Sequence, residues 1–250
     1  MVYLDCHDAT SALTSLATAF HLHDDDLARA LLECNLETDW TGEREERSIR
    51  SFLSEIDVDL DSVRFDGAYY FHGTRSLEPE AFIREGILPL GAVIDRIWSS
   101  LYDLVRDQVN ESDWQKFRAE LERDGGGHSG RLYRIKVSNA FHHGPYAMLV
   151  RDNHFNPSTI GGHDYLATPE IVEDIGRAFN ENLQERFENK AKKCIVKFRS
   201  SRVQGGALTA ALWYAYSAVR GDPAGWACLH SIDCKGAILP GAVVGVEQVR

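Results

Sequence analysis

The chain has 250 residues, of which 44% are hydrophobic and 26% are charged, and its formal net charge at pH 7 is -11. This composition is typical of a folded globular protein and excludes a long disordered or low-complexity chain. The negative charge repels phosphate polyanions, so the overall field does not favour nucleic-acid binding.

The N-terminus and the cysteines predict a soluble cytoplasmic protein. The first residues, MVYLDCHDAT, include an early acidic residue and no apolar run of signal length, and no membrane interaction is expected. The chain has five cysteines, which is an odd number, and no two of them have C-x-x-C spacing. Neither a disulfide framework nor a zinc knuckle is therefore predicted.

The first sixty residues read as a helical region without strands. Apolar residues recur at helical spacing in HDDDLARALLECN and again in EREERSIRSFLSEI. We therefore predict a helical N-terminal region over residues 1–62, packed outside the sheet-bearing body and offering a surface for a partner. Residues 63–250 are predicted to form the second domain.

The second domain is predicted to alternate strands with helices of unequal length. GAYYFHGT reads as a buried strand that ends in a tight turn at Gly73. RLYRIKV and YAMLV are predicted strands, as are CIVKFRS, CLHSI and AVVGVEQV. Helices are predicted from Pro79 to Gly86, as a hairpin over 94–121, from Thr168 to Phe187, and after Gly206.

Unequal helical stretches between the strands favour an α+β fold over a doubly wound one. We expect a split antiparallel sheet core with flanking helices and the helical N-terminal region. A G-x-G-x-x-G motif after a strand and a Walker loop are both missing from the sequence, as is a G-x-S-x-G elbow. Any nucleotide site must therefore be built by other means.

The most informative stretch runs from Tyr69 to Leu90, YYFHGTRSLEPEAFIREGILPL. A histidine at the end of a buried strand, followed by glycine and threonine, would present an imidazole and bare backbone amides at a sheet edge. Such a pattern is typical of a binding site. The alternative is that His72 is a hydrogen-bonded core histidine and Gly73 only turns the chain.

His72-Gly73-Thr74, followed by a helix and Glu85-Gly86-Ile87, resembles the first motif of the ADP-ribosyltransferases. The similarity is to the histidine-containing branch of diphtheria toxin and the poly(ADP-ribose) polymerases; the RNA 2'-phosphotransferases also carry His-Gly-Thr. The resemblance implies that NAD is the substrate and that His72 and Gly73 hold it, with Thr74 beside them. The acceptor of ADP-ribose would be a protein, a nucleic acid or water.

The resemblance also implies an anion near the ribose and an aromatic ring against nicotinamide. Cleavage of the nicotinamide–ribose bond develops positive charge on the sugar, which an acid must stabilise. The late acids Asp233 and Glu247 are equal candidates for this catalytic role. Tyr146 and Tyr214 are candidates for the ring, although each could equally be a core ring with a hydrogen-bonded hydroxyl.

A histidine-rich stretch, residues 142–163, supports a different hypothesis. His142, His143, His154 and His163 lie near two acids in sequence, and imidazole and carboxylate groups bind zinc or iron. Their spacing lacks a helical H-E-x-x-H pair, so no metal is predicted. The alternatives to the NAD-consuming enzyme are therefore a non-catalytic interaction or nucleotide-sensing protein and, third, a metal-dependent hydrolase.

Overall fold

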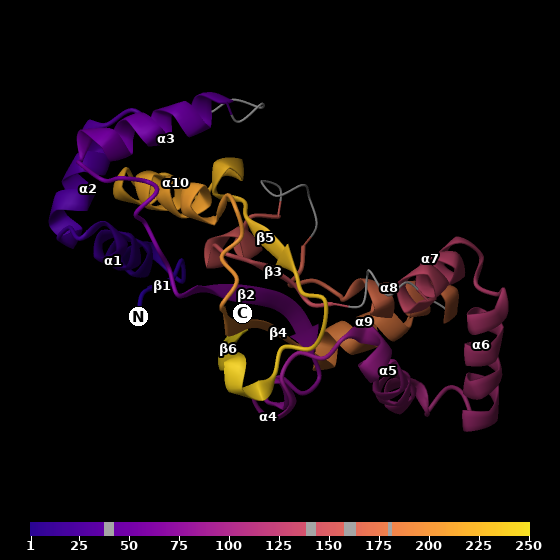
Figure 1. The fold of residues 1–250 in the computed structure, drawn as a ribbon. Coiled ribbons are helices and arrows are strands. Elements are labelled where there is room, and N and C mark those ends of the chain that lie inside the picture. Colours follow the sequence, from indigo (N-terminus) through magenta and orange to yellow (C-terminus); the bar gives the residue numbers. More distant parts are fainter. Residues whose placement is uncertain (38–42, 139–143, 158–163, 180–181) are drawn as a thin grey trace. The chain divides into compact units, whose positions relative to one another are not determined.

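The computed structural model of the protein describes residues 1–37, 43–138, 144–157, 164–179 and 182–250 (Figure 1). It has one sheet, with strand order β5-β3-β2-β4-β6 and with β1 beside β2. The strands are β1 (Tyr3–Leu4), β2 (Gly67–Ser76), β3 (Tyr146–Met148), β4 (Lys192–Ser200), β5 (Ser231–Asp233) and β6 (Val243–Val249). Strand β2 pairs antiparallel with β3 and parallel with β1. The predicted α+β fold, with a sheet core, flanking helices and helices near the N-terminus, is confirmed.

Strand β2 carries the His-Gly-Thr motif and differs from the prediction at its end. The strand does not turn at Gly73 but continues to Ser76. In the sheet order β2 lies between β3 and β4, and its antiparallel register with β3 places Phe71 opposite Met148. The motif is therefore inside an interior strand and not at a sheet edge.

The chain divides into two compact units, each assembled from separate stretches. Unit 1 contains residues 1–71, 147–164 and 197–232, and unit 2 contains residues 72–146, 165–196 and 233–250. The predicted boundary between residues 62 and 63 is not a boundary of these units. A separate function for residues 1–62 stays a prediction.

Unit 1 is built mainly from helices whose apolar faces are buried. The helix α1 packs against α2 and α10, and α2 also packs against α10. Leu16, Leu27 and Ala211 of these helices are fully buried. The predicted N-terminal helices are confirmed, but Tyr3 and Leu4 form β1, so this part of the chain is not free of strands. Its helices are α1 (Ala9–Phe20), α2 (Asp24–Glu33), α3 (Glu43–Glu55), η2 (Arg151–Phe155), α10 (Ala207–Val219) and η4 (Trp226–Cys228).

Unit 2 contains the predicted helical hairpin and one helix that the sequence did not predict. The stretch RLYRIKV, predicted as a strand, is part of α7. Tyr133 of this helix is buried, and its hydroxyl accepts a hydrogen bond of 2.9 Å from Trp98 Nε1. This tertiary packing overrides the alternating pattern. The helices are α4 (Ala81–Glu85), α5 (Leu90–Val105), α6 (Glu111–Arg123), α7 (Gly127–Ser138), α8 (Glu170–Phe179), α9 (Asn182–Lys190) and η5 (Pro240–Ala242).

A hydrophobic cluster joins α5, α6, α7, α8 and α9 within unit 2. The ring centroids of Trp98 and Trp114 are 5.0 Å apart in an edge-on arrangement, and Phe117 and Tyr133 pack on Trp98 in the same way. Buried aromatic contacts of this kind dominate core energetics. In the described part of the chain, no helix has both the length and the apolar character needed to cross a membrane.

Candidate functional site

A cavity of about 350 Å³ lies within unit 2, lined by residues of β2, α4, α5, α8 and α9 and by the start of β3. Much of its wall is apolar, including Phe82, Ile97 and Val172. The polar residues His72, Thr74, Arg75 and Glu85 also line it. An apolar hollow with a few polar groups is the usual form of a small-molecule site, and its volume falls at the lower end of the range of about 300–1,000 Å³.

His72 is half-buried on β2, and its hydrogen bonding fixes the form of its ring. Nδ1 lies 2.7 Å from the main-chain oxygen of Tyr146, and because a carbonyl only accepts, Nδ1 carries the hydrogen. Burial lowers the pKa of His72, against the opposing effect of this hydrogen bond. The neutral ring therefore offers Nε2 as a hydrogen-bond acceptor, which suits a ligand hydroxyl or amide.

The next two motif residues differ in their position. Thr74 lines the cavity, so its hydroxyl is available to the same ligand as His72. Gly73 is buried within β2 and is not among the residues that line the cavity. The expected bare amides at a sheet edge were a wrong prediction, because β2 has a neighbouring strand on each side.

Tyr146 begins β3, lines the cavity and is paired with a second tyrosine. Its ring stacks on that of Tyr165, with centroids 4.8 Å apart and an interplanar angle of 17°. Burial, followed by the influence of Tyr146, raises the pKa of Tyr165, and Asp233 contributes to the same shift. Sequence reasoning missed Tyr165, since no spacing in GGHDYLATP points to it.

Tyr214 lies in unit 1, on α10, and is not among the residues that line the cavity. Its ring is buried, and its hydroxyl donates a hydrogen bond of 2.7 Å to Asp152 Oδ2. The sequence allows two interpretations of Tyr214, a ring against nicotinamide or a core ring with a hydrogen-bonded hydroxyl. This contact is the one expected from the core ring.

The two late acids are in unit 2 but outside the cavity wall. Asp233 is exposed at the end of β5, and Glu247 is half-buried on β6. Among the described residues, the acids that line the cavity are Glu78 and Glu85. Arg96 is in close contact with Glu85, and this hydrogen bond lowers the pKa of Glu85, so its carboxylate is ionised at neutral pH.

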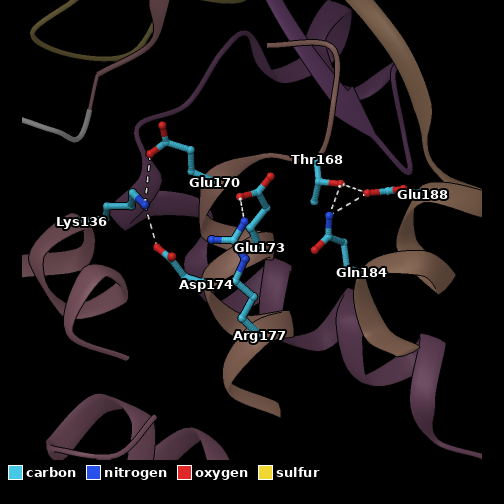
Figure 2. Close-up of polar contacts among 8 residues, drawn as sticks. All are labelled: Lys136, Thr168, Glu170, Glu173, Asp174, Arg177, Gln184 and Glu188. Atoms are coloured by element: carbon cyan, nitrogen blue, oxygen red, sulfur yellow. Dashed lines mark hydrogen bonds and ion pairs between the residues drawn. The ribbon is translucent and has the colours of Figure 1, made fainter. Parts of the chain in front are cut away.

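Arg75 also lines the cavity and is bonded to Glu188, a member of the polar network on the right of Figure 2. In that network, the Glu188 carboxylate accepts hydrogen bonds from Thr168 Oγ1 and, over 2.9 Å, from Gln184 Nε2. These bonds lower the pKa of Glu188, to which the charge of Arg75 contributes. Arg75 Nη1 itself donates to the main-chain oxygen of Glu188 over 2.8 Å.

The histidine-rich stretch can be described only in part. His142, His143 and His163 lie outside the described residues. His154, on η2, is buried, and its Nε2 lies 2.9 Å from the main-chain oxygen of Phe71. Across the described ranges, no group of three or more histidine, cysteine or acidic residues is placed to hold a metal ion. The metal hypothesis is not tested by these residues.

No protein family, curated protein or solved structure matches the chain. The function is therefore argued from the cavity of unit 2 and from the motif residues that line it. Three of the residues selected from the sequence, His72, Thr74 and Tyr146, meet at this cavity.

Proposed function

We propose that the protein is an NAD-consuming enzyme of the ADP-ribosyltransferase type. It would cleave the nicotinamide–ribose bond and transfer ADP-ribose to a protein, a nucleic acid or water. The observation that carries the proposal is that His72 and Thr74 of the motif share one cavity with Tyr146, which was selected from a distant part of the sequence.

The chemistry of the wall suits a nucleoside. The neutral ring of His72 can accept a hydrogen bond from a ribose hydroxyl through Nε2, because its Nδ1 is engaged with Tyr146. Thr74 supplies a hydroxyl within the same cavity. Apolar residues such as Phe82 and Ile97 can cover a planar base or nicotinamide ring.

The reaction also requires an anion near the ribose as positive charge develops there. Three acids compete for this role in the proposal: Asp233 and Glu247, from the resemblance, and Glu85, which is ionised and lines the cavity. Replacing each by its amide should lower turnover more than NAD binding only for the acid that faces the transition state.

The test is NAD binding by calorimetry together with nicotinamide release. His72→Ala should weaken NAD binding by about ten- to a hundredfold, because a hydrogen bond is lost and a buried partner is left unsatisfied. The matched control is His128→Ala, since His128 is an exposed histidine of the same unit. If the wild-type protein does not bind NAD, or if His72→Ala binds it as tightly, the proposal is wrong.

A second candidate function is nucleotide sensing without turnover. It is favoured by one observation, that neither Asp233 nor Glu247 lines the cavity. NAD binding without nicotinamide release, in the presence and absence of cell extract, would select this function. A cytoplasmic location stays part of the proposal for either function.

A further inference from the structure

Arg75 has an incomplete set of hydrogen-bond partners. It follows the His-Gly-Thr motif directly on β2 and lines the cavity. Nη1 donates to the main-chain oxygen of Glu188 over 2.8 Å, whereas Nε is buried and has no acceptor among the described residues. Buried donors without an acceptor are rare in folded proteins, and each calls for a physical explanation.

The acids near Arg75 do not complete its bonding. The charge of Arg75 contributes to the lowered pKa of the Glu188 carboxylate, but this carboxylate accepts its hydrogen bonds from Thr168 and Gln184. Within the described ranges, Arg75 is in no ion pair closer than 4.0 Å. The guanidinium therefore keeps donor capacity at the wall of the cavity.

The other charged residues of the wall differ from Arg75 because they are already paired. Arg96 is in close contact with Glu85, and Glu78 lies 3.8 Å from Arg84. These contacts leave Arg75 as the cation of the wall that has no paired acid in the part of the chain that the structure describes. A guanidinium presents several donors in a fixed plane, which fits the oxygens of a phosphate.

The position of Arg75 relative to His72 limits the ligand. Both residues line the same cavity, and three steps along a strand span about 10 Å, so one nucleotide can reach both. His72 offers an acceptor, which suits a sugar hydroxyl, and Arg75 offers donors, which suit an anion. The two residues of the cavity wall are thus complementary to different parts of one phosphorylated nucleoside.

We infer that Arg75 is an anion-binding residue of this cavity and that it binds the diphosphate of a nucleoside diphosphate ligand. The assignment of this ligand to the ADP-ribose part of NAD rests on the proposed function. The guanidinium would donate to a phosphate oxygen through Nη2, while Nη1 keeps its bond to Glu188 and holds the side chain in place.

The experiment compares ADP-ribose, adenosine and inorganic pyrophosphate by calorimetry on the full chain. Arg75→Gln should weaken ADP-ribose binding by about ten- to a hundredfold, since charge-assisted hydrogen bonds are lost, and should leave adenosine binding unchanged. Arg106→Gln is the matched control, because Arg106 is 70% exposed and does not line the cavity. Wild-type affinity for ADP-ribose should also fall with added salt more steeply than that of Arg75→Gln.

Three results would overturn the inference. Arg75→Gln could bind ADP-ribose as tightly as the wild type, it could lose adenosine and ADP-ribose equally, or the wild type could bind neither ADP-ribose nor pyrophosphate. Arg75→Lys guards against a folding defect: it keeps the charge but not the planar fork, so its affinity for ADP-ribose should lie between those of the wild type and Arg75→Gln.

The outcomes also separate the anion site from the proposed enzyme. If ADP-ribose binding depends on Arg75 but NAD releases no nicotinamide, the anion site stands and the enzyme proposal fails. If NAD is cleaved and Arg75→Gln cleaves and binds it as the wild type does, the enzyme proposal stands and the role of Arg75 is wrong.

Discussion

Two regions of unit 2, the hydrophobic cluster around Trp98 and the cavity wall on β2, differ in how completely their polar atoms are hydrogen-bonded. In the cluster, Trp98 Nε1 donates to Tyr133, and near it Lys136 Nζ lies 2.6 Å from Asp174 Oδ2. In the cavity wall, Arg75 Nε is buried without an acceptor among the described residues. Polar groups that find partners within the protein contribute to stability, and donors left open at a cavity contribute to binding.

The two regions are nevertheless in contact through shared residues. Leu101, Ile171, Val172 and Phe187 belong to the cluster and also line the cavity. The cluster therefore forms part of the cavity wall. Variants of the cluster should act on stability first, whereas variants of the motif should act on ligand binding without unfolding the protein.

The largest expected effect is that of Trp98→Ala. Trp98 is 2% exposed and packs against Trp114, Phe117 and Tyr133. Its removal leaves a large void, so the free energy of unfolding should fall by about 3–5 kcal/mol. Denaturant unfolding followed by circular dichroism measures the change.

The matched control for this prediction is Trp226→Ala. Trp226 is 53% exposed, so its replacement should change the free energy of unfolding by less than about 0.5 kcal/mol. Equal losses for Trp98→Ala and Trp226→Ala would show that the buried packing of Trp98 in the cluster stabilises the protein no more than an exposed tryptophan does.

An intermediate effect is expected for Lys136→Met. Figure 2 shows Lys136 between Glu170 and Asp174, and the Asp174 side chain is only 3% exposed. Loss of the ammonium leaves a buried carboxylate without its cation, which should lower the free energy of unfolding by about 1–3 kcal/mol. The double variant Lys136→Met/Asp174→Leu should recover part of this loss, because it removes the uncompensated charge.

Arg177→Met controls for the loss of an ordinary helix ion pair. Arg177 contacts Glu173 over 3.0 Å, also drawn in Figure 2, but its side chain is 58% exposed. Loss of such a pair should cost only about 0.3–0.5 kcal/mol of unfolding free energy.

If the double variant Lys136→Met/Asp174→Leu does not recover stability relative to Lys136→Met, Lys136 acts through packing and not through its charge.

The fold was predictable where the apolar periodicity agrees with the residues that start helices or form turns. The helix after Thr168-Pro169 does begin at Glu170, although α8 and α9 are separate helices and were predicted as one. The α7 stretch was not predictable from its own pattern. Its fold depends on Tyr133 meeting Trp98, which lies 35 residues away in the sequence. No local signal contains that contact.

The candidate site was predictable where a motif selects residues and not where long-range partners decide. His72 and Thr74 were found from their own sequence, and Tyr146 from its place before a strand. Arg75 belongs to the same stretch, but its hydrogen bonding depends on the main chain of Glu188, which lies 113 residues further on. Likewise, the bonded state of Tyr214 depends on Asp152, which is 62 residues away.

The smallest expected effect is a pH dependence of stability that belongs to His72. Burial lowers the pKa of His72 in the folded protein, whereas the unfolded side chain keeps a value near about 6.5. As the pH falls below the unfolded value, the unfolded state takes up the proton first, so stability is lost; above that value the neutral ring costs nothing. His72→Gln cannot titrate and should show a smaller decrease in unfolding free energy between about pH 7.5 and pH 5.5 than the wild type.

His128→Gln, which replaces an exposed histidine of the same unit, should retain the wild-type decrease. His230 also has a pKa lowered by burial, but it is present in every variant, so the difference between wild type and His72→Gln isolates the motif histidine. An identical pH dependence in His72→Gln and the wild type would show that the ring is solvated in the folded state, and the cavity wall would then lack the neutral acceptor that distinguishes it from the cluster.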